Sequence, residues 1–583
     1  LRIDAPWHAP DDFPAGFTVF FPAQPDFRGK ISEYQATSRK ILVEEDLPFV
    51  PVPGEPVELV SGWEAPILAA RLAMATQGIG LGQASVTLRL ATTRCTNALL
   101  ERKGIPPVFF VTRGFRDLLR IGDQRRLGLF DLCPRKRQPL HGDVVEVKER
   151  LDRAGTVIEP LDLETLREPI QLLLDGGCRV AAISLLHSHA NPEHENALAE
   201  FLGKMGFEVV ASSAALRPFA KWLPRAESAV VEAYLTPVLS QYLRNVASEI
   251  AEGSIRVMTS AGGLVGTASY RAIDSLLSGP AGGVVGAVAV SRRAGLDKII
   301  ALDMGGTSTD VSRFDADFDY SDRHVVGEVL VSAPALRIET VAAGGGSVCR
   351  LDGELLAVGP GSAGARPGPA CYGFGGPLCL TDVNLLLGRL EPSLFAIPVF
   401  PEESEGRLAE ILAGSGRSRE ETLFGFLEVA NDLMAGAIRK ISVREGYDPS
   451  EYALVAFGGA GGQHACGVAE KLGITRVLSP ADAGLLSAYG LSRASLERIA
   501  ERQVLGPLNE ELLLSIEDEL REEALAALEA EGIAVLGEEI RRKTAFLRYQ
   551  GQDAPLEVDY QELADLQALF ESRYTQVFGY LPS

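Results

Sequence analysis

The chain has 583 residues, of which 46% are hydrophobic and 23% charged, and a mean hydropathy of +0.09. These values are typical of a globular protein with several domains, because a single core rarely grows beyond about 250–300 residues. A formal charge of −22 argues against a nucleic-acid-binding surface. No apolar run reaches the length of a membrane span, and residues 1–16 lack the basic and apolar segments of a signal peptide.

Seven cysteines are scattered along the chain without a CxxC pair. An odd, scattered set does not form a disulfide framework, and reduced thiols are typical of the cytoplasm. We therefore predict a cytoplasmic protein that binds neither nucleic acid nor membrane.

The pattern of apolar runs and turns predicts three regions. Residues 1–60 are rich in proline and show one strand pair, around 17–21 and 31–34. From 64 to 250, apolar strands at 108–112, 180–186 and 207–211 alternate with helices, which indicates an α/β domain over residues 1–250. A second α/β domain is expected over 251–500. A C-terminal α+β region over 501–583 holds an acidic helix at 508–531 and a hairpin at 543–560.

Residues 298–314 carry the most informative motif. An apolar run leads to Asp303, a turn follows, and Asp310 opens a second apolar run; the turn holds Gly305, Gly306, Thr307, Ser308 and Thr309. Glycines let backbone N–H groups approach an anion, and the hydroxyls add donors. The two aspartates can hold Mg²⁺ or orient an attacking oxygen. The turn has no lysine, so it is not a Walker A loop.

This motif has two interpretations. One is an ordinary β-hairpin with a glycine turn. The other is a nucleotide-binding hairpin that looks like the phosphate hairpin of the actin, sugar-kinase and Hsp70 superfamily. Two acids bracketing the turn favour the nucleotide interpretation.

Two further glycine-rich segments follow. Residues 341–376 hold Gly344, Gly345 and Gly346, and we predict a long loop without elements of its own, either functional or a lid. Residues 452–472 predict a strand, a turn and a helix, and the turn contains Gly458, Gly459, Gly461 and Gly462. Gln463 and His464 follow this turn and could contact a ligand or cap the helix.

A histidine-rich run, LLHSHANPEHE, covers residues 185–195 and includes His187, His189 and His194. Histidine and carboxylate are usual metal ligands, but the spacing matches no zinc signature. Asn191, Pro192 and an acid also describe a plain helix start. We favour the helix start and leave His187 and His189 as active-site candidates.

Together these segments resemble the hydantoinase A / 5-oxoprolinase family of ATP-dependent enzymes, and most of all its 5-oxoprolinase and N-methylhydantoinase A branch. The matching stretches run in order through the chain: ATTRCTNALLERKG, LLHSHANPEHE, LLSGPAGGVVG, DMGGTSTDVSRF, ETVAAGGGS, VGPGSAGARPGPACYGFGGP and FGGAGGQHACGVAEKLG. The resemblance implies a two-lobed, actin-like ATPase fold of the ribonuclease H-like class. It also implies chemistry in which ATP phosphorylates the oxygen of a cyclic amide, so that water can open the ring.

The resemblance assigns roles to the residues of these motifs. Asp303 and Asp310 would be catalytic and would bind Mg²⁺. The turn residues 305–309 would hold ATP phosphates, Gly344 to Gly346 would border the nucleotide, and Gly458, Gly459, Gly461 and Gly462 would flank the adenosine. The implied cofactors are ATP and Mg²⁺, with K⁺ as a further candidate ion.

One departure from the family pattern concerns the N-terminus. The family normally opens with another phosphate hairpin, an acid followed by Gly-Gly-Thr-Phe-Thr-Asp, but residues 14–29 here lack the glycine pair and the second acid. Thr18 is a candidate remnant. Either this loop has degenerated or residues are absent, and the chain also stops at residue 583, where family members usually continue.

The sequence therefore predicts an ATP-dependent cyclic-amide hydrolase subunit of the 5-oxoprolinase or hydantoinase type. The expected partners are a small cyclic-amide substrate and a hydantoinase B-type subunit in a homo- or hetero-oligomer. The alternatives are a ketone carboxylase subunit acting on acetone or acetophenone, and a non-catalytic scaffold or regulatory subunit.

Overall fold

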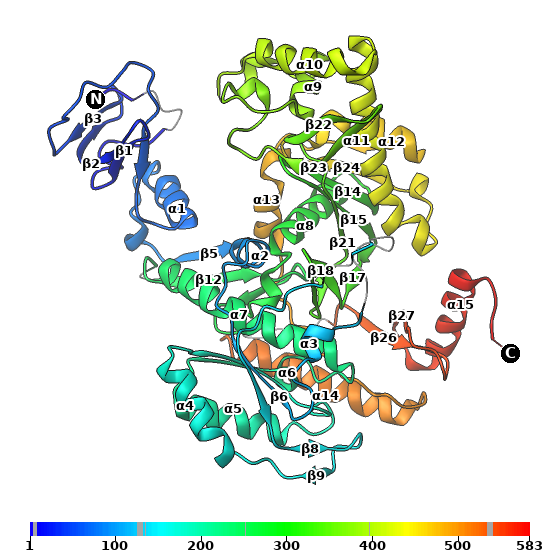
Figure 1. Cartoon of the computed structure of the whole chain (residues 1–583). Helices are drawn as coiled ribbons and strands as arrows, with labels where there is room; N and C mark the ends of the chain where they lie inside the picture. Colours follow the sequence, from blue (N-terminus) through cyan, green and yellow to red (C-terminus); the bar gives the residue numbers. More distant parts are fainter. Residues whose placement is uncertain are drawn as a thin grey trace.

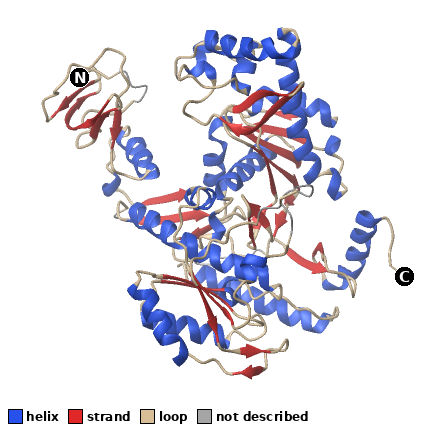
Figure 2. Cartoon of the chain, viewed as in Figure 1, coloured by secondary structure: helices blue, strands red, loops and turns tan. Residues whose placement is uncertain are grey.

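The computed structural model describes residues 1–3, 8–124, 132–133, 136–250, 252–395, 397–532 and 540–582. Helices flank the larger sheets, so the fold is of the predicted α/β class (Figure 2). No helix in these residues combines the length and the apolar character needed to cross a bilayer.

An antiparallel sheet forms the N-terminal part, in the order β3-β2-β1-β4. Its strands are β1 (Thr18–Phe21), β2 (Gln24–Gln35), β3 (Lys40–Val43) and β4 (Glu58–Val60), followed by α1 (Ala65–Ala75). The predicted pair is confirmed, since Thr18 lies opposite Lys30. Phe17, Phe21 and Ile31 form part of its small core. Figure 1 shows this sheet at the edge of the molecule, away from β14 and β15.

A parallel sheet in the order β11-β10-β6-β7 follows. It consists of β6 (Val108–Thr112), β7 (Val144–Val147), β10 (Val180–Ser184) and β11 (Val209–Ser212). Alternate residues of β6 face opposite layers: Phe110 packs with α4 (Arg167–Asp175) and α5 (Glu193–Met205), while Phe109 packs with α7 (Trp222–Ala247). The predicted alternation of strands and helices is confirmed here. Shorter elements nearby are α3 (Leu118–Ile121), β8 (Arg150–Leu151), β9 (Val157–Glu159) and α6 (Ser213–Leu216).

A small sheet joins β5 (Val86–Leu90), β12 (Gly253–Met258) and β13 (Leu264–Gly266), with α2 (Arg94–Leu100) after β5. The largest core includes residues on both sides of position 250, among them Val246 and Val257. The division into regions 1–250, 251–500 and 501–583 stays a prediction.

The central sheet runs β16-β15-β14-β24-β25, with β21 added beside β15. Its strands are β14 (Lys298–Met304), β15 (Thr309–Asp315), β16 (Asp317–Phe318), β21 (Ile338–Val341), β24 (Ala453–Phe457) and β25 (Val477–Leu478). Ile299 and Ala301 pack with α8 (Ser278–Arg293), whereas Ile300 and Leu302 pack with α11 (Arg419–Ile441) and α12 (Gly461–Leu472). Because β14 is covered on both faces, its residues form a continuous apolar run.

The prediction that residues 341–376 form a loop without elements is wrong. This segment contains β22 (Ser347–Asp352) and β23 (Leu355–Ser362), which pair as an antiparallel hairpin. Asp352 and Leu355 flank a turn in which Gly353 adopts a φ of +63°. The abundance of glycine hid a short alternating strand pattern, in which Cys349 and Val358 point into the core.

The other elements are mostly short: β17 (Tyr320–Ser321), β18 (His324–Val326), β19 (Val329–Val331), β20 (Ala335–Leu336), α9 (Leu380–Leu386), α10 (Pro401–Ser415) and α13 (Leu486–Arg493). The C-terminal region has α14 (Glu510–Glu529), β26 (Lys543–Leu547), β27 (Leu556–Tyr560) and α15 (Leu566–Phe578). The predicted acidic helix and hairpin are confirmed.

Candidate active site

Two carboxylates lie side by side where β14 and β15 meet their connecting turn. Asp303 and Asp310 are direct partners in the antiparallel register. Burial and the charge of Asp310 raise the pKa of Asp303 to about 6. Burial also raises the pKa of Asp310, although the Thr340 hydroxyl, which donates to Asp310 Oδ1 at 2.6 Å, opposes this shift. Two adjacent carboxylates with raised pKa values are typical of a functional site, and a bound cation would relieve their repulsion.

The raised pKa of Asp303 predicts how an asparagine substitution affects stability. Between pH 3.8, the ordinary pKa of an aspartate, and about pH 6, Asp303 is protonated in the folded chain but ionised in the unfolded chain. The free energy of unfolding therefore falls as pH rises through this range, and the whole destabilisation by Asp303 is present above about pH 6. We expect Asp303→Asn to raise the free energy of unfolding by up to about 3 kcal/mol at pH 8 and by little at pH 4.

Urea unfolding at both pH values measures this difference. The control is Asp352→Asn, because Asp352 is exposed in the β22–β23 turn. An equal effect of Asp303→Asn at pH 4 and pH 8 would show that Asp303 titrates normally.

The turn between the two aspartates leaves its backbone accessible. Gly306 and Thr307 are exposed, and a Cβ built on Gly306 would meet no atom within 4 Å. Gly306 does not adopt a positive φ either. Neither packing nor backbone conformation within the chain requires glycine there, which is expected where a ligand approaches the backbone.

Thr309 differs from the other hydroxyl residues of the turn. It is fully buried, and its hydroxyl donates to the Ala343 carbonyl at 2.5 Å. Thr309 thus holds the hairpin against the segment that precedes the Gly344 loop, and its hydroxyl is already used within the chain.

The glycine loop 344–346 packs directly on the turn. Gly345 N donates to Gly305 O at 3.0 Å, and Gly346 N donates to Gly306 O at 2.6 Å. A Cβ on Gly344 would lie 2.6 Å from Ser308 N, so this position excludes a side chain. Thr381 fixes the other side of the loop, because its backbone N–H and its hydroxyl both donate to Gly345 O.

The second glycine turn, after β24, lies against the same strand end. Gly458 adopts a φ of +79°, and a Cβ there would lie 2.4 Å from Met304 O and 2.5 Å from Asp303 Oδ1. A Cβ on Gly459 would meet no atom within 4 Å. Helix α12 begins at Gly461, where a Cβ would approach Leu302 O at 3.4 Å. The structure thus brings three glycine segments, distant in sequence, to one end of β14.

His464 is the centre of a buried hydrogen-bond network and does not point into solvent. It is fully buried on α12; its Nδ1 contacts Asn431 Oδ1 at 2.9 Å and its Nε2 contacts Asn384 Nδ2 at 3.1 Å. Burial and the nearby Arg389 lower its pKa to about 4, so the ring is neutral. His464 does not cap the helix; its buried ring joins α12 to α9 and α11.

We expect His464→Leu to lower the free energy of unfolding by about 2–4 kcal/mol, because it leaves Asn431 and Asn384 with unsatisfied buried groups. Cys466→Ser is the control, since Cys466 is exposed on the same helix and should change stability by less than about 0.5 kcal/mol. Urea denaturation measures both, and equal stability of the two variants would contradict the role given to His464.

Segment 14–29 and the histidine-rich run, the other candidates predicted from the sequence, are not part of the β14–β15 turn. The segment 14–29 belongs to the N-terminal sheet, which is remote from β14 and β15 (Figure 1). His187 and His189 follow the end of β10 in the parallel sheet, and His194 lies in the first turn of α5. The described residues contain no group of three or more His, Cys, Asp or Glu arranged to hold a metal. All seven cysteines are free, as predicted.

Sequence reasoning missed two residues that shape the site, Thr340 and Thr381. Thr340 lies on β21, opposite Asp310 in the register. Thr340 lies in the matching block ETVAAGGGS (339–347), and Thr381 opens another matching block, TDVNLLLGRL (381–390). The contact of Thr381 with the glycine loop depends on how α9 packs, so the sequence did not single it out.

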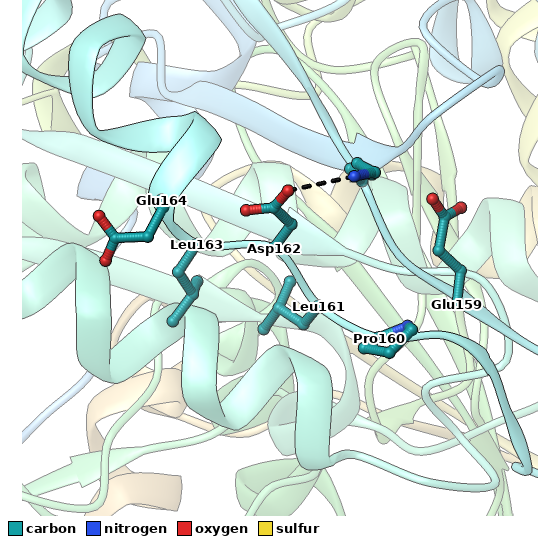
Figure 3. Close-up of a pocket in the computed structure, with 7 residues that line it drawn as sticks. Glu159, Pro160, Leu161, Asp162, Leu163 and Glu164 are labelled. Atoms are coloured by element: carbon teal, nitrogen blue, oxygen red, sulfur yellow. Dashed lines mark hydrogen bonds and ion pairs between the residues drawn. The ribbon is translucent and has the colours of Figure 1, made fainter.

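A surface depression of about 410 Å³ lies elsewhere, lined by Lys148 and residues 159–164 (Figure 3). Its charges are paired with one another or with neighbours: Lys148 with Asp162 at 3.2 Å, Glu164 with Arg167 at 2.7 Å, and Glu159 with Arg113 at 3.2 Å. This depression contains none of the glycine loops, and its lining indicates no reaction.

Comparison with known proteins identifies the family. The profile described as "Hydantoinase/oxoprolinase" matches residues 225–500, and its "N-terminal region" matches residues 61–206. The caprolactamase subunit alpha of Pseudomonas jessenii is 30% identical over 537 residues, which are 84% of this chain and 75% of that protein. The chain belongs to the hydantoinase/oxoprolinase family.

Family members with long chains are also similar. The 5-oxoprolinase PfmaA of Pestalotiopsis fici is 39% identical over 551 residues, 86% of this chain and 43% of that protein. The chain therefore spans under half the length of this relative.

Two solved structures resemble the chain. The ATP-dependent caprolactamase from Pseudomonas jessenii superposes with a TM-score of 0.76 and 27% identity, over 96% of this chain and 84% of that chain. Nucleotide-free acetone carboxylase superposes with a TM-score of 0.66 and 26% identity, over 88% and 79%. The resemblance stated from the sequence is thus confirmed at the level of the hydantoinase/oxoprolinase family.

Proposed function

We propose that this hydantoinase/oxoprolinase chain binds Mg-ATP at the β14–β15 turn and uses it to activate a cyclic amide for ring opening. The observation that carries the proposal is the opposed pair Asp303 and Asp310, at a glycine turn on which two other glycine segments converge. Support also comes from relatives whose names specify 5-oxoprolinase and ATP-dependent caprolactamase.

The residues fit a magnesium-bound nucleotide in two respects. Mg²⁺ is usually held by one or two carboxylates together with substrate phosphates, so the pair of aspartates suffices without a third protein ligand. Gly306 and Gly459 leave open space at the two turns, where backbone N–H groups can contact phosphate or nucleoside. ATP, when bound, would supply the phosphoryl group that activates the amide oxygen.

Each part of the chain has a separate task in this proposal. Asp303 and Asp310 hold the cation and orient the reacting oxygen. Thr340 fixes Asp310 through its 2.6 Å hydrogen bond, and Thr309 fixes the turn through Ala343 O. The hydrogen bonds from Gly345 and Gly346 hold the β14–β15 turn against the 344–346 loop, and they limit the motion of the turn during the reaction.

The proposal extends to the fold and to a partner. The central sheet with α8 on one face and α11 and α12 on the other would be one lobe of an actin-like ATPase. Residues 14–29 do not supply another phosphate hairpin beside it (Figure 1). We also propose that a hydantoinase B-type polypeptide takes part in the activity, since the similar caprolactamase polypeptide of Pseudomonas jessenii is named subunit alpha.

A second candidate function is ATP-dependent carboxylation of a ketone, favoured by the structural similarity to acetone carboxylase. Phosphate release measured against 5-oxoproline, hydantoin, caprolactam, acetone and acetophenone separates the two functions, with and without a B-type subunit and bicarbonate. We expect stimulation by a cyclic amide without bicarbonate. Stimulation by ketones that requires bicarbonate would replace the proposed function with the carboxylase. The absence of Mg-ATP binding would indicate a scaffold.

A further inference from the structure

The parallel sheet β11-β10-β6-β7 contains a reversal of strand order between β6 and β10. The chain passes from β6 to β7 on one side and later places β10 on the other side. Helix α3 follows β6 on one face, and α5 follows β10 on the opposite face. In open α/β sheets, ligands bind outside the carboxyl ends of the strands at such a reversal.

The histidine-rich run lies at this place, directly after β10. A hydrogen bond of 2.8 Å from Leu186 N to Thr112 Oγ1 joins it to the end of β6. The Thr112 hydroxyl in turn donates to Glu149, whose other oxygen contacts His194 Nδ1 at 2.8 Å. His194 is therefore part of a buried chain of contacts that connects the two strand ends.

A second buried carboxylate, that of Glu195, holds the loop through hydrogen bonds. Glu195 is fully buried and accepts five hydrogen bonds of 2.7–2.9 Å, from Leu185 N, Ser188 Oγ, Ser212 Oγ, Ser213 Oγ and Ala214 N. A loop held in this way is preorganised, because its backbone and hydroxyl groups already have their partners.

The same loop carries two imidazoles, those of His187 and His189. The rings of His187 and His189 lie 5.9 Å apart. His187 has a φ of +61°, a strained conformation for a residue other than glycine, and such strain is concentrated at functional sites. His189 Nδ1 is buried without a hydrogen-bond partner among the described residues. Burial and Arg225 lower the pKa of His189 to about 4, so its ring is neutral, with one donor and one acceptor.

The neighbouring charges argue against an anion. Arg225 donates to Ser213 Oγ, Phe219 O and Leu185 O, so its guanidinium is used within the chain. A metal is not favoured either, since the described part of the chain offers no cluster of three ligands.

Aromatic side chains flank the same strand ends. Phe115 follows β6 and packs edge-on against Trp222 at 4.8 Å. Trp222 Nε1 donates to Ser184 Oγ, at the last residue of β10. A neutral, flat ligand with adjacent donor and acceptor groups suits these surroundings.

We propose that this edge of the sheet binds the –CO–NH– edge of a neutral heterocycle, with one imidazole of the His187–His189 pair donating to the ring carbonyl and the other accepting from the ring N–H. This chemistry occurs in lactams and hydantoins and also in nucleobases such as uracil. The site uses none of the residues of the β14–β15 turn, and it does not depend on ATP hydrolysis.

Titration calorimetry of the full chain, without nucleotide, tests the proposal. We expect 2-pyrrolidinone and hydantoin to bind, and N-methyl-2-pyrrolidinone, which lacks the N–H, to bind at least about tenfold more weakly. His189→Ala should weaken binding by a similar factor, and His189→Gln, which keeps a donor and an acceptor, should restore most of it. His8→Ala is the control, since His8 is exposed in the N-terminal part.

The results distinguish a nucleobase from a lactam or hydantoin as the ligand, and they test this site separately from the proposed ATP site. Tighter binding of uracil than of hydantoin would assign the site to a nucleobase, and the reverse would assign it to a lactam or hydantoin. Asp310→Asn should leave this binding unchanged, even if it removes ATP turnover. Equal binding of 2-pyrrolidinone and its N-methyl derivative, or no binding of either ring class, would overturn the proposal without requiring any variant to fold.

Discussion

We expect Asp310→Asn to lower the proposed amide-stimulated ATP turnover by at least about 100-fold, because it removes a charge that faces Asp303 across the hairpin and would hold the cation. The substitution keeps the size of the side chain, and Asn can still accept the hydrogen bond from Thr340. The loss should therefore appear in kcat, measured as phosphate release, without a loss of stability. Because burial raises the pKa of Asp310, the variant should be at least as stable as the wild type at pH 8.

Two variants accompany this measurement. Thr340→Val keeps both carboxylates but removes the hydroxyl that positions Asp310, so we expect a smaller loss, of about tenfold. Asp352→Asn, in the exposed turn of the β22–β23 hairpin, should have no effect. Turnover retained by Asp310→Asn would remove the β14–β15 turn from the mechanism.

Gly458→Ala should have the largest effect on stability, a loss of about 2–5 kcal/mol. Its φ of +79° disfavours any side chain, and the new Cβ would lie 2.4 Å from Met304 O. The same Cβ would press on Asp303 Oδ1, so any folded protein should also lose ATP turnover. Thermal or urea unfolding measures the first effect, and phosphate release the second.

Gly459→Ala is the matched control. Its Cβ would meet no atom within 4 Å and Gly459 has no positive φ, so stability should change by less than about 1 kcal/mol. If the turn contacts a nucleotide, this variant should nevertheless raise the KM for ATP. Equal destabilisation by the two alanines would contradict the packing argument for Gly458, and an unchanged KM would remove Gly459 from the nucleotide site.

The sequence predicted those parts of the fold that depend on local pattern. The apolar run before Asp303 and the one after Asp310 defined both strands of the hairpin, and the acidic helix and hairpin at the C-terminus followed from periodicity and turns. The pairing of Asp303 with Asp310 was implicit in the hairpin, since a short turn fixes the register.

Other features depend on contacts between distant segments. Thr309 looked like a phosphate ligand because of its place in the turn, but the Ala343 carbonyl, which takes its hydrogen bond, belongs to another strand connection. The hairpin β22–β23 was missed because glycines at 353, 359 and 361 resemble a loop when cross-strand pairing is unknown. The position of His189 at a reversal of strand order required the sheet topology, which no local pattern gives.

Calorimetric titration of Mg-ATP into the full chain and into Asp310→Asn tests most directly whether the two aspartates form an ATP site. We expect saturable binding by the wild type that depends on Mg²⁺, and binding at least about tenfold weaker by Asp310→Asn. No binding by the wild type, or equal Mg²⁺-dependent binding by both proteins, would contradict the claim that Asp303 and Asp310 form the centre of an ATP site.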